Sequence, residues 1–476
     1  MTVSNDKCKN KADLDGRHVY EFCPADNAIF PRCMIHYYYR NADNIPDFMD
    51  FATLKSTFHH TLSVCLPMTL GSQVHMETPP FGKLTITVDG TSPRLPPVTK
   101  HVDTVHTVAE MAARGFVIAS QPSVLAEAPL MLNPLEGDPL VTLDVVYMAD
   151  GVGLLLAFSH AIVDLPGFQK FVDQWSCLNR SLVSKQRTIG YLPQQLDTDR
   201  MRFWNAVLKY PEPETSDIEQ HLDMLVAAAD KNNTVECLSS ATKENNDEQI
   251  QQVCPEIPSD YGVYRIEVPL AAIDELTQLK AQICPEVTVP NLIAATLWRC
   301  LSLTHPSSSY TYFANSLSIR NNTEFTHFCG NTATIKYTYQ KTATIISQNI
   351  FQTSQQIQRS ARSFGVGEFA RIIKGYVTSG SKYSSNLTRF VETHRVPRLI
   401  VTNVSRIPFY ETDFGYGTPI KLFFPATVPP GLCAFTPLSK EGGIDILIRT
   451  TENAIENIKS DQLLGERIVV YRHDMA

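Results

Sequence analysis

Two residues that could carry acid–base chemistry, His160 and Asp164, stand four residues apart in the sequence H-A-I-V-D, directly after a strongly apolar stretch. Imidazole has an unperturbed pKa of about 6.5, so a large share of histidine side chains is neutral at cellular pH. A neutral imidazole can take a proton from an attacking hydroxyl or amine. Pro166 and Gly167 follow shortly after Asp164 and favour a loop. A side chain next to such a loop can project into a cleft. A lone histidine is more often a hydrogen-bonded core residue, so this spacing alone assigns no function.

A second segment, near the C-terminus, reads Asp413-Phe414-Gly415-Tyr416-Gly417. Glycine adopts backbone conformations that other residues avoid, and aspartate is common in turns. One glycine on each side of Tyr416, after an aspartate, therefore predicts a tight, irregular turn. Taken alone, this signal is weak.

The elements that must position these residues mix helices with strands. A helix is predicted over residues 51–66, and a hairpin of two strands, 142–148 and 152–159, has Asp-Gly at its turn and ends at His160. Helical periodicity resumes at Phe168. The second half is predicted to contain strands at 263–268, 399–402 and 444–448 and helices at 271–283, 290–303 and 451–464, the middle one capped by Thr288.

The organisation of the chain follows from its length of 476 residues, which is too long for one small module. Residues 206–258 are polar and charged and predict a linker, in which a short helix over 220–229 is expected. We therefore predict an N-terminal domain at 1–205 and a C-terminal domain at 259–476, both of the α/β class.

Composition excludes several classes of protein. Hydrophobic residues make up 43% of the chain and charged residues 19%, which indicates a globular protein with a large core. The chain has a formal net charge of -8, whereas proteins that bind nucleic acids usually carry an excess of basic residues. Nucleic acid is therefore not expected as a main partner. No apolar run approaches the roughly 20 residues of a membrane-spanning helix, and the polar N-terminus predicts a cytoplasmic protein without a membrane partner.

The cysteines and histidines give no sign of a metal site. The chain has 11 cysteines, an odd number without a C-x-x-C pair, so neither a zinc site nor a disulfide framework is expected. His59 and His60, on the helix predicted over 51–66, cannot both bind one metal ion without further ligands. No metal and no permanently bound cofactor are predicted.

Taken together, the two motifs resemble those of the BAHD family of CoA-dependent acyltransferases, whose members carry H-x-x-x-D in the first half and D-F-G-W-G near the C-terminus. Their order and spacing both fit. The similarity extends over most of the chain, including A-A-T-L-W-R within residues 288–299, Gly330-Asn331 and the segment 442–447. The D-F-G-Y-G form is more similar to fungal than to plant members.

The resemblance implies two chloramphenicol-acetyltransferase-like domains, each a mixed sheet with flanking helices, and an active-site channel between them. It implies that His160 is the general base and that acyl-CoA, most simply acetyl-CoA, is a co-substrate that reacts in a ternary complex without an acyl-enzyme. Asp164 would be a structural anchor, with Arg320 as its partner. Thr402 matches the position of a family hydroxyl residue and would donate to the oxyanion, although it also fits an ordinary strand.

The same resemblance assigns Asp413, Gly415 and Gly417 a structural role, with only an indirect effect on CoA binding. It does not select the basic residues that would hold the CoA phosphates.

Four residues depart from the family pattern. Leu165 stands where a glycine usually follows the motif aspartate, and Tyr416 replaces the usual tryptophan of the second motif. Val404 occupies a common tryptophan position, and Ser318 a common aspartate position before Arg320. The turn beside His160 is therefore expected to differ in detail.

The function implied by the resemblance is transfer of an acyl group from CoA to a hydroxyl of a small specialised metabolite by a monomeric enzyme. Three alternatives stay open: an N-acyltransferase, a condensation-domain-like enzyme that uses a carrier-protein thioester, and a non-catalytic relative. Ser159 stands where the condensation enzymes usually have a first histidine, which argues against that alternative. The intact His160 and Asp164 argue against a non-catalytic protein.

Overall fold

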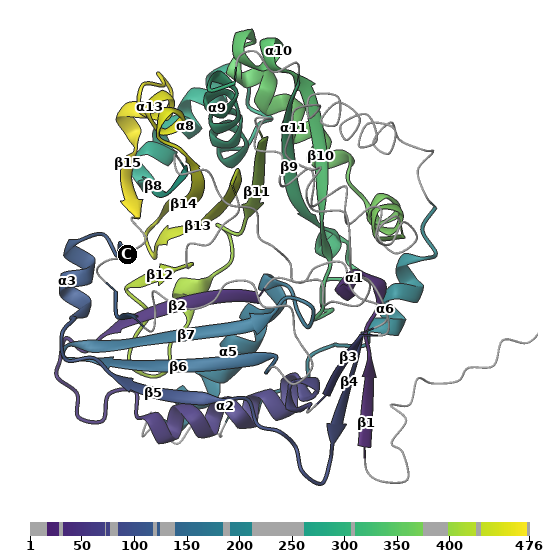
Figure 1. Cartoon of the computed structure of the whole chain (residues 1–476), viewed down its shortest axis with the longest axis vertical. Coiled ribbons are helices and arrows are strands. Elements are labelled where there is room, and N and C mark those ends of the chain that lie inside the picture. Colours follow the sequence, from purple (N-terminus) through teal and green to yellow (C-terminus); the bar gives the residue numbers. More distant parts are fainter. Residues whose placement is uncertain are drawn as a thin grey trace, which may run out of the picture.

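Two large mixed β-sheets form the frame of the protein in a computed structural model of the chain. In Figure 1 one sheet lies in the upper half of the view and the other in the lower half. The predicted α/β class is therefore confirmed. The structure describes residues 17–27, 32–71, 73–76, 84–117, 121–123, 139–183, 191–211, 261–305, 310–374, 398–424 and 430–473.

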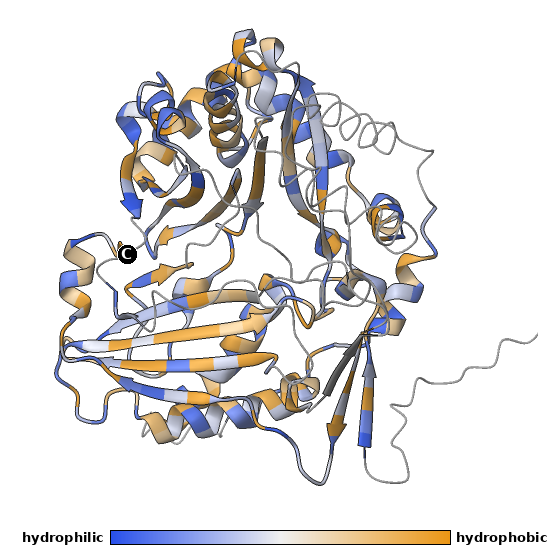
Figure 2. Cartoon of the chain, viewed as in Figure 1, coloured by the Kyte–Doolittle hydropathy of each residue, from blue (hydrophilic) through white to orange (hydrophobic). Residues whose placement is uncertain are grey.

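The first of these sheets has five strands in the order β12-β2-β7-β6-β5. The strands are β2 (Arg32–Arg40), β5 (Val98–Val102), β6 (Val141–Met148), β7 (Gly151–Ser159) and β12 (Lys421–Phe423). β5 pairs with β6 in parallel, and the other pairs are antiparallel. Figure 2 shows that the central strand β7 is mainly apolar, and all 9 of its residues are buried, as expected for a strand covered on both faces.

The hairpin predicted before His160 is confirmed, because β6 and β7 pair with Met148 opposite Gly151. Helices α2 (Phe51–Cys65) and α5 (Leu165–Val183) pack together on one face of this sheet. The indole of Trp175 on α5 donates to the hydroxyl of Thr57 on α2 at 3.0 Å. β7 and α5 thus hold the two ends of the segment that carries His160.

The loop predicted at Pro166 and Gly167 is wrong, because α5 already begins at Leu165. Proline is tolerated in the first turn of a helix, where its missing N–H has no helical partner. Asp164 caps this turn: its Oδ1 accepts from the backbone N–H of Gly167 at 3.0 Å.

The second large sheet has seven strands in the order β10-β9-β11-β13-β14-β8-β15. Its strands are β8 (Tyr261–Val268), β9 (Tyr310–Ser318), β10 (Ala333–Lys341), β11 (Arg398–Asn403), β13 (Leu432–Ser439), β14 (Gly442–Thr451) and β15 (Val469–His473). The helices of this half are α8 (Leu270–Ile283), α9 (Val289–Leu303), α10 (Thr342–Ser347), α11 (Ile350–Ser363) and α13 (Glu452–Lys459). The predicted cap of α9 is confirmed, since Thr288 Oγ1 accepts from the N–H of Asn291 at 3.3 Å.

Helix α13 is shorter than the predicted helix 451–464, because it ends at Lys459. Asp461 then accepts hydrogen bonds from the backbone N–H groups of Leu463 and Leu464 at 2.8 and 3.1 Å. An aspartate that binds the following backbone in this way stabilises a turn in place of further helix.

The remaining elements are a small sheet and short helices. The sheet β1-β4-β3 consists of β1 (Arg17–Glu21), β3 (Gln73–Met76) and β4 (Leu84–Asp89). The α-helices are α1 (Pro24–Asn27), α3 (Val108–Ala113) and α6 (Arg200–Val207). The short 3-10 helices are η1 (Pro67–Leu70), η3 (Ile319–Asn321), η4 (Phe409–Glu411) and η5 (Gly465–Arg467).

A group of four charged residues joins the two large sheets, and three of them are buried and Glu267 is half-buried. We call Arg265, Glu267, Lys421 and Asp445 the junction cluster. Asp445 on β14 accepts from Arg265 Nε on β8 at 2.8 Å and from Lys421 Nζ at 2.8 Å. Arg265 also contacts Glu267 and donates to the carbonyl of Gly115, just after α3. Because Lys421 belongs to β12 of the five-stranded sheet, the junction cluster links both sheets through side chains.

Residues 212–260 lie outside the described residues, so most of the predicted linker 206–258 and its helix at 220–229 cannot be compared. The predicted division into residues 1–205 and 259–476 stays a prediction. Among the described helices, none is both long and apolar enough to cross a membrane.

Candidate active site

His160 occupies the first position of the turn between β7 and α5. The strand ends at Ser159, and the helix begins at Leu165. A buried central strand and a capped helix thus fix both ends of a five-residue turn, which places the histidine on rigid scaffold. The His160 side chain is half-buried, whereas Ala161, Ile162 and Val163 are fully buried.

The partner of the His160 ring is Asn331, which lies between η3 and β10. His160 Nδ1 and Asn331 Oδ1 are 2.8 Å apart. The Asn331 amide nitrogen faces three groups that can only accept: the carbonyls of His160 and Ala161, at 2.8 and 3.3 Å, and Asp26 Oδ1, at 3.1 Å. The amide oxygen must therefore face the ring, which assigns the proton to Nδ1.

This assignment leaves Nε2 of neutral His160 without a proton and able to accept one. Burial lowers the pKa of His160 below its usual value, while the charge of Asp164 and the hydrogen bond to Asn331 oppose that shift. A lowered pKa keeps the imidazole neutral at neutral pH. The geometry and the protonation state both suit a general base.

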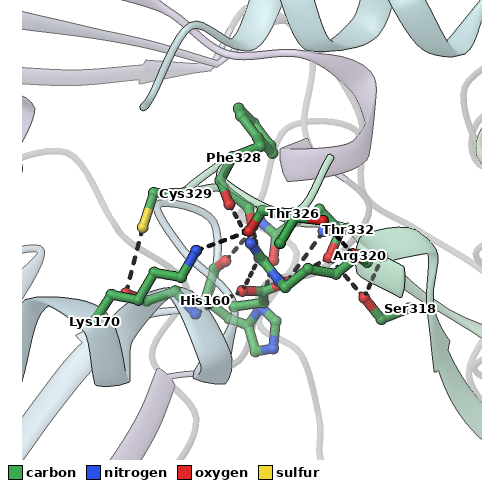
Figure 3. A network of polar contacts seen from close by, with 12 residues as sticks. His160, Lys170, Ser318, Arg320, Thr326, Phe328, Cys329 and Thr332 are labelled. Atoms are coloured by element: carbon green, nitrogen blue, oxygen red, sulfur yellow. Dashed lines mark hydrogen bonds and ion pairs between the residues drawn. The ribbon is translucent and has the colours of Figure 1, made fainter. Parts of the chain in front are cut away.

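Asp164 contacts other groups and not the His160 ring. Its carboxylate accepts from Arg320 Nη2 at 2.6 and 2.8 Å and from Thr332 Oγ1 at 2.8 Å. Arg320 in turn donates to the carbonyls of Phe328 and Gly330. Figure 3 shows Arg320 at the centre of this network and His160 at its edge.

Ser318, in the place of a family aspartate, supports the same turn. Its Oγ accepts from the backbone N–H of Arg320 at 3.1 Å and lies 2.8 Å from Thr332 Oγ1. A serine in this position caps η3 and so fixes the backbone of Arg320.

The D-F-G-Y-G segment forms the tight turn that its glycines predict. Asp413 Oδ1 accepts from the backbone N–H groups of Gly415, Tyr416 and Gly417 at 2.7, 3.1 and 2.9 Å. Gly415 and Gly417 have φ values of +99° and +95°, a region that other residues rarely adopt. The carboxylate thus closes a turn that only glycine enters without strain.

This turn inserts the ring of Phe414 into the core beside α5. Phe414 is fully buried, and its centroid lies 4.4 Å from that of Trp175. Asn179 Nδ2, also on α5, donates to the Phe414 carbonyl at 2.8 Å. The second motif therefore contacts α5, the helix that Asp164 caps.

Thr402 lies on β11, between β9 and β13 in the seven-stranded sheet. Its side chain is half-buried. Because His160 follows β7 of the five-stranded sheet, His160 and Thr402 come from different sheets. The role of Thr402 as an oxyanion donor stays a prediction.

Sequence reasoning quoted Asn331 only as part of a resemblance, and it missed Asp26 and Arg200. Asn331 lies 171 residues from His160 along the chain, and Asp26 lies 305 residues from Asn331. No periodicity or spacing connects residues so far apart. Fully buried polar residues next to the site are the signal that finds them.

Comparison with known proteins gives consistent results over most of the chain. The model of the Transferase family matches residues 120–464, which include His160 and Asp413. A hydroxycinnamoyltransferase from Narcissus pseudonarcissus is 23% identical over 453 residues, covering 90% of this chain and 91% of the relative.

Two solved structures share the fold. TRI101 of F. sporotrichioides, complexed with coenzyme A and T-2, superimposes with a TM-score of 0.64 at 15% identity, covering 96% of this chain and 100% of the other. Vinorine synthase superimposes with a TM-score of 0.56 at 10% identity, covering 96% and 94%.

Proposed function

Because the chain belongs to the Transferase family of BAHD acyltransferases, we propose that this acyltransferase moves an acyl group, most simply acetyl, from CoA to a hydroxyl of a small specialised metabolite. The observation that carries the proposal is the hydrogen bond between His160 Nδ1 and Asn331, which leaves Nε2 free as a base. The TRI101 structure holds coenzyme A together with a small molecule, T-2, which supports the two classes of substrate. The D-F-G-Y-G form favours a fungal member, and we expect a cytoplasmic monomer.

In the proposed reaction, His160 Nε2 takes the proton of the acceptor hydroxyl while the hydroxyl oxygen attacks the carbonyl carbon of the thioester. The new C–O bond forms first, the C–S bond then breaks, and the imidazolium returns the proton to the sulfur of the leaving CoA. No acyl-enzyme forms. Thr402 is our candidate donor to the transient oxyanion, a contribution of several kcal/mol in a site without water.

Asn331 supports this cycle through the ring nitrogen that does not react. It accepts from Nδ1–H in both the neutral and the protonated ring, so the imidazole keeps its orientation when it gains a proton. Asp164 and Arg320 act at a distance from the reacting atoms by fixing the turn, as do Asp413, Gly415 and Gly417 through α5.

The first test measures donor binding without knowledge of the acceptor. The purified protein is titrated with acetyl-CoA, longer acyl-CoAs and free CoA, and the melting temperature is followed, since a ligand of the folded state raises it by mass action. A saturable increase ranks the acyl donors. No increase at millimolar donor, with folded protein, contradicts CoA dependence and favours a carrier-protein thioester or a non-catalytic protein.

The second test measures transfer. Release of free CoA thiol is followed with a panel of alcohols and amines that includes T-2, and products are identified by mass spectrometry. His160→Ala is expected to lower turnover by about a hundredfold to ten-thousandfold with the fold intact. His60→Ala, which changes an exposed histidine on α2, is the matched control. Normal turnover of folded His160→Ala would remove His160 from the mechanism, and an amide product would overturn O-transfer.

A further inference from the structure

A fully buried carboxylate, Asp26, lies behind Asn331 on the side away from the His160 ring. Asp26 Oδ1 accepts from the Asn331 side-chain amide at 3.1 Å and from its backbone N–H at 3.3 Å. Asp26 Oδ2 accepts from the backbone N–H of Cys23 at 3.1 Å. The residue belongs to the short helix α1, which the H-x-x-x-D motif does not include.

The charge of Asp26 is balanced by Arg200, at the start of α6. Arg200 Nε lies 3.1 Å from Asp26 Oδ2, and both side chains are buried. The guanidinium also lies over the ring of Phe22, 4.4 Å from its centroid, and donates to the carbonyls of Ile162 and Thr198. Because Ile162 is in the turn of His160, Arg200 contacts both the turn and the carboxylate behind it.

The Asn331 amide nitrogen has three acceptors, and Asp26 is the charged one among them. Hydrogen bonds to an ionised acceptor are roughly twice as strong as neutral ones. Asp26 therefore has the largest part in keeping the amide oxygen toward His160 Nδ1. A reversed amide would place its N–H against Nδ1, move the ring proton to Nε2 and remove the base.

We propose that Asp26 is a positioning residue that acts through Asn331 to keep His160 in the Nδ1–H tautomer, and that Arg200 balances the charge of Asp26 in the core. This inference rests on the proposed function, in which His160 is the base. No proton passes to Asp26. Its negative charge, one residue removed from the ring, also stabilises the imidazolium that forms when Nε2 takes the acceptor proton.

The central experiment is a double-mutant cycle of Asp26→Asn and Asn331→Ala. Asp26→Asn keeps the size of the side chain but removes the charge, and we expect kcat to fall about 10- to 100-fold, with a much smaller change in KM for the acyl-CoA. In the Asn331→Ala background the same substitution should lower kcat by less than about threefold, because the connecting amide is gone. Equal losses in both backgrounds would overturn action through Asn331.

A spectroscopic measurement reads the tautomer without any substrate. The protein is labelled with ¹⁵N-histidine, and the His160 signals are assigned by their loss in His160→Gln. Wild-type His160 should show a protonated Nδ1 and a bare Nε2 above its pKa, and Asp26→Asn should shift the signals toward the other tautomer and lower that pKa. A wild-type ring protonated on Nε2, or an unchanged spectrum in Asp26→Asn, would overturn the inference.

Two further variants separate positioning from folding. Asp26→Asn/Arg200→Gln removes the buried charge pair together, so it can be studied if the unpaired arginine of Asp26→Asn prevents folding. Because Arg200 also donates to Ile162 in the turn of His160, the double variant should lose at least as much kcat as Asp26→Asn. Asp445→Asn, in the junction cluster, changes another buried aspartate that is paired with an arginine, and it should lower stability without moving the His160 signals. If the tautomer is as expected but no acyl-CoA is ever used, the proposed function fails and the positioning role stands.

Discussion

Arg320 donates to both carboxylate oxygens of Asp164 at 2.6 and 2.8 Å, although 156 residues separate them along the chain. The same carboxylate caps α5 through the N–H of Gly167 and binds Thr332 of the second half. Asp164 therefore joins three separate parts of the chain behind the turn of His160. These contacts support the anchor role proposed for Asp164, since both of its carboxylate oxygens have partners other than the His160 ring.

Asp164→Ala should lower stability as well as activity. The substitution leaves the largely buried Arg320 without its carboxylate partner, and loss of one partner of a buried ion pair typically costs about 3–5 kcal/mol. It also removes a helix cap worth about 1 kcal/mol. Denaturant unfolding and kcat are measured together, with Asp199→Ala as the control, since Asp199 caps α6 through Arg202 N–H and is exposed. A loss of activity with unchanged stability would contradict the anchor role.

The activity should fall at acidic pH with a midpoint below the usual range for histidine. Burial lowers the pKa of His160, so the neutral base persists to a pH lower than about 6.5, the value of a free imidazole. As pH falls through the lowered pKa, the imidazole becomes protonated and cannot accept the acceptor proton. The acid limb of kcat/KM for wild-type protein is measured in buffers of constant ionic strength. A midpoint above 6.5, with stable protein throughout, would assign the limb to another group.

The sequence predicted those parts of the fold that depend on neighbouring residues. Asp-Gly between two apolar runs predicted the β6–β7 hairpin, and Thr288 before an apolar helix predicted the start of α9. The predicted start of α5 at Phe168 was wrong, because α5 begins at Leu165. Proline ends a helix when it lies in the interior, but it is well tolerated in the first turn. Local signals of this kind cannot decide between the two uses of a proline.

The site was predictable only in part, because its contacts join distant segments. His160 and Asp164 form a local motif, whereas Arg320 was proposed from a resemblance and not from spacing. Asn331 and Asp26 contact each other across 305 residues, and nothing in the hydrophobic periodicity refers to such pairs. Buried polar side chains require hydrogen-bond partners, and the partners of these two can be identified only once the fold brings the segments together.

The junction cluster should make the protein sensitive to acid. Burial alone would raise the pKa of Asp445, but Lys421 and Arg265 outweigh it and hold the pKa below its usual value. The resulting stability is complete above about 3.9, the pKa in the unfolded chain, and is lost as pH falls through the lowered folded pKa. Asp445→Asn should destabilise the protein by about 3–5 kcal/mol at neutral pH, because two buried cations lose the carboxylate that they share, although Glu267 stays nearby. Unfolding free energies between neutral and acidic pH are compared; an equally steep acid loss in the variant would exclude Asp445 as its source.

The two glycines of the second motif allow backbone strain to be separated from crowding. Both have positive φ, so alanine at either position should cost about 1–3 kcal/mol. A Cβ on Gly415 would lie 3.3 Å from the Cα of Arg180 and from the Cβ of Val183, both on α5, whereas a Cβ on Gly417 would meet nothing within 4 Å. We therefore expect Gly415→Ala to be the more destabilising, and to lower kcat because it displaces α5, whose N-terminal turn adjoins the turn of His160. Urea unfolding and turnover are measured for both variants. Equal losses of stability would show that strain alone makes glycine necessary, and a loss of turnover in Gly417→Ala without loss of stability would place this turn closer to the substrate than its contacts indicate.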